Sequence, residues 1–108
     1  MIIDFLDPIN YNMKYLIVDG CLSGTGIRDK YLGGYVNPVL LGLSSIFIKK
    51  LDSWLKNYED EFYNQYINTE RVKDLDKEGE DIALLLKKEL ANSKIEYYSD
   101  AMMTSKLI

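Results

Sequence analysis

Two consecutive stripes of apolar residues with helical spacing place the strongest constraint on how this chain folds. The first stripe follows a serine cap at Ser44 or Ser45 and steps mostly by three or four residues along one helical face. Its members are Phe47, Leu51, Trp54, Leu55, Tyr58, Phe62 and Tyr66. No glycine or proline interrupts it, so the stripe predicts an amphipathic helix of about six turns over residues 45–67.

A second stripe follows the cap signal Asn68-Thr69 and predicts another long helix over residues 69–91. Its members are Val72, Leu75, Gly79, Ile82, Leu86 and Leu90. Glycine costs about 1 kcal/mol of helix propensity relative to alanine, so its place on the stripe needs a reason. We therefore expect Gly79 to lie where the two helices approach closely, with a break into two helices near Asp76 as the alternative.

Two short segments on either side of the helices have the composition of strands. Residues 13–18 read Met-Lys-Tyr-Leu-Ile-Val before the turn signal Asp19-Gly20, and residues 94–98 read Lys-Ile-Glu-Tyr-Tyr. We expect these strands to pair in a small sheet packed against the two helices, which is an α/β fold, with α+β as the alternative. A chain of 108 residues has room for one domain, 1–108, and residues 103–108 are expected to form a loosely held tail.

Composition excludes several classes of function. The chain has no histidine, which excludes His-based metal sites and His-dependent catalytic dyads, and its one cysteine excludes an internal disulfide. The net charge of −4 argues against a nucleic-acid-binding protein. No run of residues approaches the ~18 to 20 apolar positions that span a bilayer, and residues 1–8 lack a basic leader. These features predict a cytoplasmic protein with no nucleic-acid or membrane partner.

The glycine-rich segment 19–38 holds five of the seven glycines and predicts irregular structure or a loose hairpin closing at Asn37-Pro38. Residues 19–29 follow a strand, as a phosphate loop does, but lack the Gly-Lys-Ser/Thr ending. Cys21 has no histidine to activate it. We therefore assign no catalytic, cofactor-binding or metal-binding residue, and expect Arg28 and Asp29 to form a structural ion pair or turn. The alternative is a small enzyme or nucleotide-binding domain that uses this loop with Asp19, Arg28 and Asp29.

The charges are unevenly distributed, which points toward a protein partner. Residues 52–81 hold ten acidic and four basic side chains, a net charge of −6, whereas the rest of the chain has a net charge of +2. Such a field either serves solubility or steers a basic partner. The chain also has nine tyrosines, a residue enriched in protein interfaces. The candidate partner-binding residues, expected on solvent-exposed faces opposite the apolar stripes, are Glu59, Asp60, Glu61, Tyr63, Asp74, Glu78 and Asp81.

Five short segments together resemble a known class of proteins. They read GTGIRD at 24–29, GGY at 33–35, WLKNY at 54–58, LDKEG at 75–79 and YYSDA at 97–101. Over about residues 13–103 their order is similar to that of small bacterial immunity proteins paired with polymorphic toxins, including those of contact-dependent growth inhibition. The resemblance implies a non-enzymatic, cofactor-free inhibitor that binds one cognate toxin domain, often a nuclease, at or beside its active site. A different reading is an adaptor that forms a homodimer through its two helices.

Overall fold

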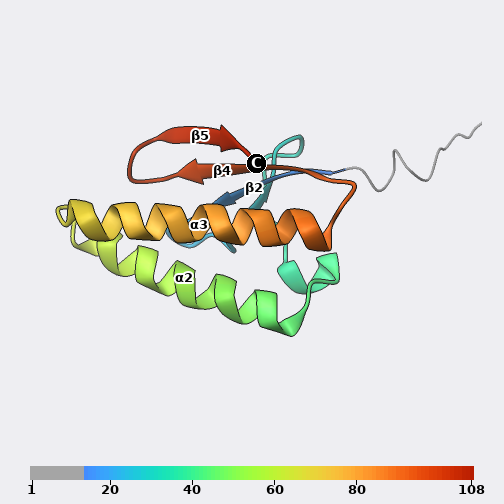
Figure 1. The fold of residues 1–108 in the computed structure, drawn as a ribbon, viewed down its shortest axis with the longest axis horizontal. Helices are drawn as coiled ribbons and strands as arrows, with labels where there is room; N and C mark the ends of the chain where they lie inside the picture. Colours follow the sequence, from blue (N-terminus) through green and yellow to red (C-terminus); the bar gives the residue numbers. More distant parts are fainter. Residues whose placement is uncertain (1–13) are drawn as a thin grey trace, which may run out of the picture.

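A four-stranded mixed sheet with two helices on one face forms the framework of this α/β fold (Figure 1). The computed structural model describes residues 14–108, so Met13, which we placed in the first strand, lies outside the described residues. The strand order across the sheet is β3-β2-β4-β5. The strands are β2 (Tyr15–Asp19), β3 (Ile27–Asp29), β4 (Lys94–Ser99) and β5 (Thr104–Leu107). Within these residues the structure confirms the expected fold class, while the extent of a single domain over 1–108 stays a prediction.

The two predicted strands pair with each other at the centre of the sheet. β2 runs parallel to β4, with Val18 opposite Tyr97. Parallel neighbours need a long crossover connection, and the two helices provide it on one face. Leu16, Val18 and Ile95 join the buried core, because alternate residues of each strand point toward the helices. The other face of the sheet carries no helix among the described residues.

The C-terminal residues form an ordered strand, so the prediction of a loose tail over 103–108 is wrong. β5 turns back after the β4 strand and pairs with it in antiparallel register, with Tyr97 opposite Lys106. The side chain of Lys106 reaches Glu80 of the second helix at 3.0 Å. All four residues of β5 are exposed, which is why the sequence shows no apolar alternation here.

The first helix, α2 (Ser45–Tyr63), begins where the sequence predicts and ends four residues early. The Ser44 hydroxyl accepts a hydrogen bond from the amide of Phe47, as a helix N-cap does. The helix stops because Gln65 and Tyr66 adopt left-handed backbone angles, with φ of 59° and 56°. The resulting turn brings the ring of Tyr66 back onto Tyr58. The predicted extension to residue 67 is therefore wrong, because tertiary packing ends the helix.

The second helix, α3 (Thr69–Glu89), is one unbroken helix, so the alternative of a break near Asp76 is wrong. Asn68 caps it by accepting a hydrogen bond from the amide of Arg71. No membrane-spanning candidate exists among the helices of residues 14–108, because none is both long and apolar enough.

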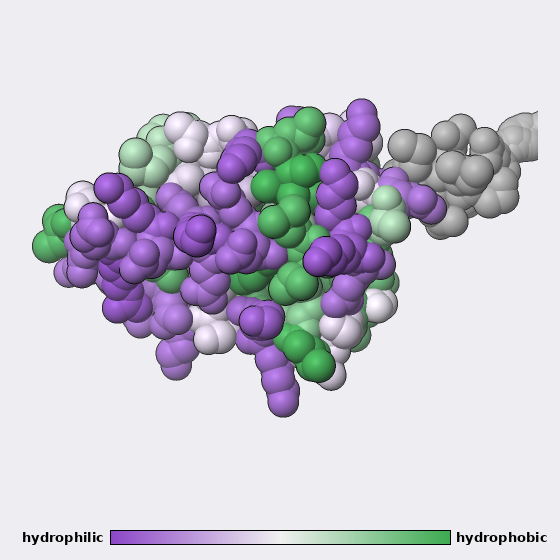
Figure 2. All heavy atoms as spheres, viewed as in Figure 1, coloured by the Kyte–Doolittle hydropathy of each residue, from purple (hydrophilic) through white to green (hydrophobic). Residues whose placement is uncertain are grey.

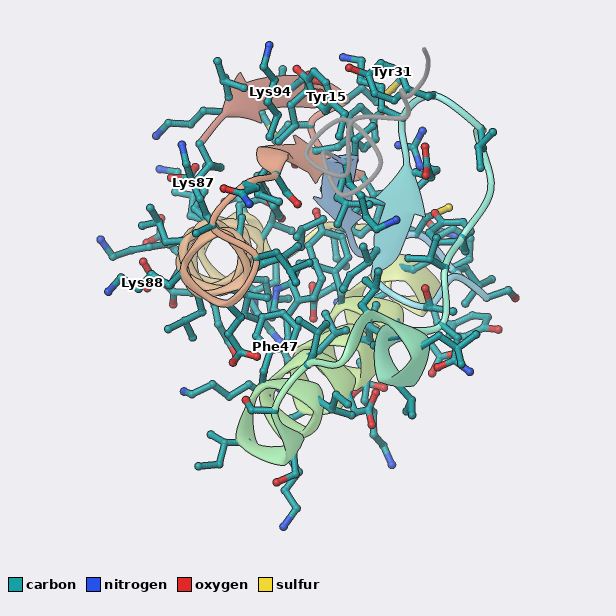
Figure 3. All side chains as sticks on the ribbon, turned by 90° about the vertical axis from the view of Figure 1, so that its right-hand side faces the viewer. Tyr15, Tyr31, Phe47, Lys87, Lys88 and Lys94 are labelled. Carbon is teal, nitrogen blue, oxygen red and sulfur yellow. The ribbon has the colours of Figure 1, made fainter. Side chains whose placement is uncertain are left out.

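Gly79 is buried where α3 meets both α2 and the β4 strand. The close approach of the two helices expected there is confirmed, and the sheet approaches the same residue. A Cβ atom at this position would lie 2.7 Å from Cζ2 of Trp54 in α2 and in still closer contact with the ring of Tyr97 in β4. The indole nitrogen of Trp54 donates to the carbonyl oxygen of Leu75 in α3 at 2.8 Å. In the same core Phe47 points inward from α2 (Figure 3).

The glycine-rich segment forms the expected hairpin, but the hairpin does not close at Asn37-Pro38 as predicted. β3 pairs antiparallel with β2, and an isolated bridge joins Arg28 to Tyr35. Asn37 does not close the hairpin but caps the short 3-10 helix η1 (Pro38–Leu41), accepting a hydrogen bond from the amide of Val39. The chain then crosses to Ser44 and enters α2.

Candidate functional site

Three of the predicted partner-binding acids share one exposed face of α3. Asp74, Glu78 and Asp81 are spaced by four and three residues, so they lie along one side of the helix. All three are exposed, and none forms an ion pair with another residue of the described part of the chain. Hydrophilic residues cover most of the α3 region in Figure 2. The structure therefore places three exposed carboxylates without ion pairs on one face of this helix, with the exposed cation Lys77 beside Glu78 in the sequence.

The predicted partner-binding acids of α2 do not share a single face with one another. Glu59 is exposed and lines a depression of about 370 Å³ between α2 and the loop of residues 20–24, together with Asp52 and Lys56. Asp60, the next residue, is also exposed. Because successive helix positions point about 100° apart, Glu59 and Asp60 face different directions.

Glu61 is buried, so the expectation that it faces solvent with its neighbours is wrong. Its side chain lies between α2 and α3, with the residue only 4% exposed. One carboxylate oxygen lies 3.4 Å from Nε of Arg71, while Oε1 has no hydrogen-bond partner among the described residues. Glu61 follows Tyr58 by three residues, a spacing that puts it on the buried stripe.

Tyr63 is the predicted residue best placed for contact with another molecule. It is the last residue of α2, its side chain is 69% exposed, and its ring meets that of Phe62 edge to face. It lies at the end of the molecule where α2 turns into α3, away from Lys87 and Lys88, which project from the far end of α3 (Figure 3).

The glycine-rich loop is organised around a buried carboxylate. Asp19, at the end of β2, is 1% exposed and forms an ion pair with Nε of Arg28 at 2.9 Å. The hydroxyl of Tyr35 and the amide of Cys21 also donate to this carboxylate, at 2.7 Å and 3.2 Å. Burial, and after it the hydrogen bond to Asp19, raise the pKa of Tyr35 above its ordinary range. These bonds hold the hairpin against the sheet.

Asp29 has the turn role that we expected. Its carboxylate accepts hydrogen bonds from the amides of Tyr31 and Leu32, both at 2.9 Å, and its carbonyl oxygen accepts from the amide of Gly33. The ion pair of Arg28 is with Asp19 instead. The expected structural roles are therefore confirmed, with the partner of Arg28 now identified.

A second buried carboxylate lies on the face of the sheet opposite the helices. Glu96 accepts hydrogen bonds from Nζ of Lys30, at 2.6 Å, and from the hydroxyl of Tyr15. Burial alone would raise the pKa of Glu96, but these two hydrogen bonds outweigh burial and hold the pKa of Glu96 below its ordinary value. Tyr15, Tyr31 and Lys94 gather beside it on this outer face (Figure 3).

A third carboxylate, that of Asp76, joins α3 to β4 and α2. Its Oδ1 accepts from the hydroxyls of Tyr97, at 2.6 Å, and Tyr58, at 2.9 Å, and its Oδ2 accepts from the hydroxyl of Ser99 at 2.7 Å. Only the tertiary structure brings the three hydroxyl donors to Asp76, since they lie 18 to 23 residues away along the chain.

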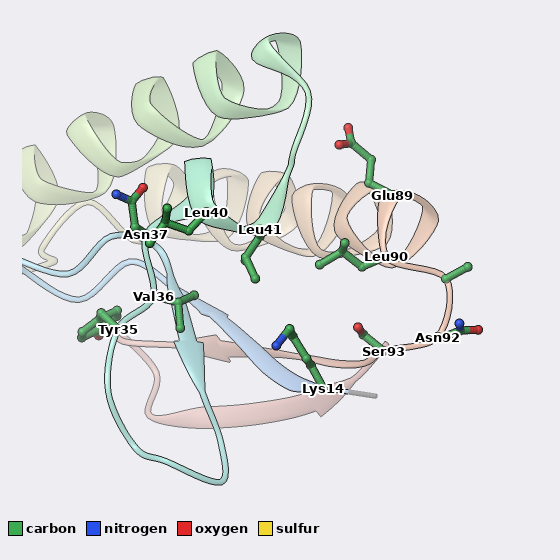
Figure 4. A pocket seen from close by; sticks show the side chains of 11 residues that line it. Lys14, Tyr35, Val36, Asn37, Leu40, Leu41, Glu89, Leu90, Asn92 and Ser93 are labelled. Carbon is green, nitrogen blue, oxygen red and sulfur yellow. The ribbon is translucent and has the colours of Figure 1, made fainter. Parts of the chain in front are cut away.

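A groove separates η1 from the C-terminal end of α3 (Figure 4). Its volume is about 760 Å³, with Leu40 and Leu41 on one wall and Leu90 and Ser93 on the other. The carboxylate of Glu89 at its rim is already bound to the amide and hydroxyl of Ser44. The only carboxylate that lines the groove is therefore engaged in capping α2.

Among residues 14–108, no three acidic or cysteine side chains lie close enough together to hold a metal ion. The chain matches no protein-family model, no curated protein and no solved structure. The geometry described above therefore carries the functional argument.

Proposed function

We propose that this chain is a cytoplasmic immunity protein that binds a cognate toxin domain and neutralises it. The observation that carries the proposal is the exposed face of Asp74, Glu78 and Asp81 on α3, whose carboxylates have no cationic partner within residues 14–108. Three carboxylates on one helix face repel one another in the free protein, and a basic partner relieves that repulsion. The sequence resemblance to immunity proteins supports the same conclusion.

A nuclease is the toxin class that fits this surface. An enzyme that cleaves nucleic acid holds the phosphate backbone in a basic groove. Carboxylates spaced along a rigid helix offer that groove an alternative set of negative charges, and the body of the inhibitor then blocks access of the substrate. Long-range attraction also speeds the encounter, which matters for a protein that must reach its toxin before damage occurs.

The glycine-rich loop supports a binding role over the enzymatic alternative. An enzyme would use the side chains of Asp19, Arg28 and Asp29, and all three already have partners within the protein. Asp19 is bound to Arg28 and to the hydroxyl of Tyr35, and Asp29 is bound to the backbone of its own turn. A catalytic group has to be within reach of a substrate. In this loop the carboxylate of Asp19 is enclosed by its own partners.

Co-expression with the toxin tests this proposal. The C-terminal domain encoded by the gene immediately upstream is expressed with and without this chain, and growth, nuclease activity and complex formation by calorimetry are measured. We expect a one-to-one complex, restored growth and loss of nuclease activity in vitro. If the upstream domain is toxic and this chain neither binds it nor restores growth, the proposal is wrong.

A further inference from the structure

The end of the molecule where the helices join exposes five large apolar side chains. Phe62, Tyr63 and Ile67 come from the end of α2 and the α2–α3 turn, and Met102 and Met103 from the β4–β5 turn. Met102 is 64% and Met103 76% exposed. Both turns lie at the same end of the fold in Figure 1, and Figure 2 shows separate hydrophobic residues among hydrophilic ones there. We call these five residues the apolar end.

A cavity of about 290 Å³ opens beside the apolar end, between the α2–α3 turn, α3 and the β4–β5 turn. Its wall is formed mainly by Tyr66, Val72, Ala101 and Met102. Asp76 also lines it, so a carboxylate borders a largely apolar cavity. Aromatic and methionine side chains around a small cavity are typical of the anchor positions of protein interfaces.

The carboxylates near this cavity have hydroxyl partners and no cationic ones. Asp76 accepts three hydroxyl hydrogen bonds, and Asp100 accepts one from the hydroxyl of Tyr66 at 2.7 Å. Neither forms an ion pair with any residue that the structure describes. Lys73 borders the cavity, but its ammonium lies 3.7 Å from Glu70 on the exposed side of the helix. The cavity therefore combines an apolar wall with one carboxylate, that of Asp76, which forms no ion pair with any residue that the structure describes.

The backbone around the cavity is held in an unusual conformation. Four residues other than glycine have a positive φ in residues 14–108, and three of them, Gln65, Tyr66 and Met103, are in the two turns beside the cavity. Such angles cost free energy of order 1 kcal/mol or more each and persist when surrounding contacts impose them. Tyr66 is itself a lining residue of the cavity, and Met103 directly follows the lining residue Met102.

We infer that this cavity receives a lysine or arginine side chain of the bound toxin domain, an inference that rests on the proposed function. The alkyl stem of a basic residue matches the wall of Val72, Ala101 and Met102, and its charged head matches the carboxylate of Asp76. The carboxylate of Asp100 is bound to the hydroxyl of Tyr66, which lines the same cavity. The ring of Tyr66 offers a cation–π contact to the same head. A carboxylate accepts at up to about four sites, so Asp76 retains one beyond its three hydroxyl donors. The apolar end then surrounds this contact and excludes water.

Titration with short peptides tests the cavity without the toxin. Acetyl-Gly-Lys-Gly-amide is added to the isotope-labelled protein, and acetyl-Gly-norleucine-Gly-amide, which lacks only the charged head, serves as the control. We expect the lysine peptide to shift amide resonances of residues 66–76 and 99–103 in a saturable way, and the norleucine peptide to leave them unchanged. Equal shifts with both peptides, or none with either, would overturn the inference.

A matched pair of variants tests the cavity in the complex. Met102→Lys places a cation at the cavity mouth, whereas Leu40→Lys adds the same charge at an exposed position of η1. We expect Met102→Lys to weaken toxin binding at least tenfold and Leu40→Lys to change it less than twofold. If Met102→Lys binds normally, the inference is wrong while the proposed function stands.

Failure of the proposed function and failure of this inference give different results. If the parent protein binds no toxin, the proposed function fails, and the peptide titration alone decides the cavity. If Met102→Lys lowers the molar mass of the free protein in solution from that of a dimer to that of a monomer, the occupant is a second copy of this chain, and the inference is overturned.

Discussion

The hydroxyl of Tyr97 donates to Oδ1 of Asp76 across 2.6 Å and so ties the centre of β4 to α3. Tyr58 of α2 donates to the same oxygen, so one carboxylate connects both helices and the sheet. The ring of Tyr97 also contacts Gly79, one turn further along α3. The packing and the polar contacts of this junction therefore depend on each other.

Replacement of Asp76 by asparagine should destabilise the fold. Hydrogen bonds to a charged acceptor contribute about 1.5 to 3 kcal/mol each, and an amide retains only part of that. We expect Asp76→Asn to lower the free energy of unfolding by about 2 kcal/mol, measured by urea denaturation. The matched control is Asp74→Asn, two residues away on the exposed face of the same helix, which should change it by less than about 0.5 kcal/mol. Equal losses in the two variants would mean that the hydroxyl network contributes nothing.

The same network makes stability sensitive to alkaline pH. Burial first, and the Asp76 carboxylate in addition, raise the pKa of Tyr58 to about 12. The ordinary pKa of tyrosine is about 10, so the folded state holds this proton more tightly than the unfolded state. The resulting stability is complete below pH ~10 and is lost as the pH rises toward 12. We expect the free energy of unfolding to fall over this range, and less steeply in Tyr58→Phe. A pH profile unchanged by Tyr58→Phe would contradict this.

Gly79 should not tolerate a side chain. A Cβ atom would lie 2.7 Å from Trp54 and closer still to Tyr97, and both rings belong to the core. We expect Gly79→Leu to lower the free energy of unfolding by about 1 to 3 kcal/mol or more, because overpacking forces these rings out of place. Gly34→Ala is the control, since nothing lies within 4 Å of a Cβ atom there. A melting temperature of Gly79→Leu at or above that of the parent protein would show that the junction can expand freely.

Most of the framework could be predicted from the sequence because it follows from periodic burial. The stripes of α2 and α3 and the caps at Ser44 and Asn68 follow from local spacing. The pairing of the two central strands follows from the long helices that separate them in the sequence. β5 escaped prediction because every one of its residues is exposed, which leaves no alternation to detect. The early end of α2 escaped because it depends on the contact of Tyr66 with Tyr58.

The polar sites were harder to predict for a physical reason. Asp76 and Glu96 are held by donors distant in the chain, such as Tyr97 and Lys30, and no local pattern marks a carboxylate that will be bound in this way. Glu61 is different, since its spacing from Tyr58 does indicate burial. Its two acidic neighbours hid that signal, because a run of acids suggests a solvated face.

Arg28 should matter for stability and not for turnover. Its guanidinium is the cationic partner of the buried Asp19, and its side chain is itself 30% exposed, so solvent screens part of the interaction. We expect Arg28→Ala to lower the free energy of unfolding by about 1 to 3 kcal/mol, with Arg28→Lys intermediate because lysine keeps the charge and loses the planar fork. A hydrolytic or transfer activity that Arg28→Ala abolishes in a folded protein would instead support the enzymatic alternative.

The acidic face of α3 should control how fast the complex forms. Single exposed charges contribute little, so the test reverses Asp74, Glu78 and Asp81 to lysine together. All three are exposed, and we expect the variant to fold normally by circular dichroism and to melt close to the parent protein.

Reversal of these three charges is expected to slow association with the toxin domain at least tenfold in stopped-flow measurements, with a smaller change in dissociation, because exposed charges act mainly during the encounter. Added salt should slow the parent protein more than the variant, since ions screen exposed charges beyond about 8 Å at physiological ionic strength. Reversal of Glu59 and Asp60, which face other directions on α2, is the matched comparison and should have a weaker effect. If the triple reversal leaves association, salt dependence and protection of growth unchanged, the face of α3 serves solubility, and any contact surface must lie on the apolar end or on the hairpin of residues 27–36.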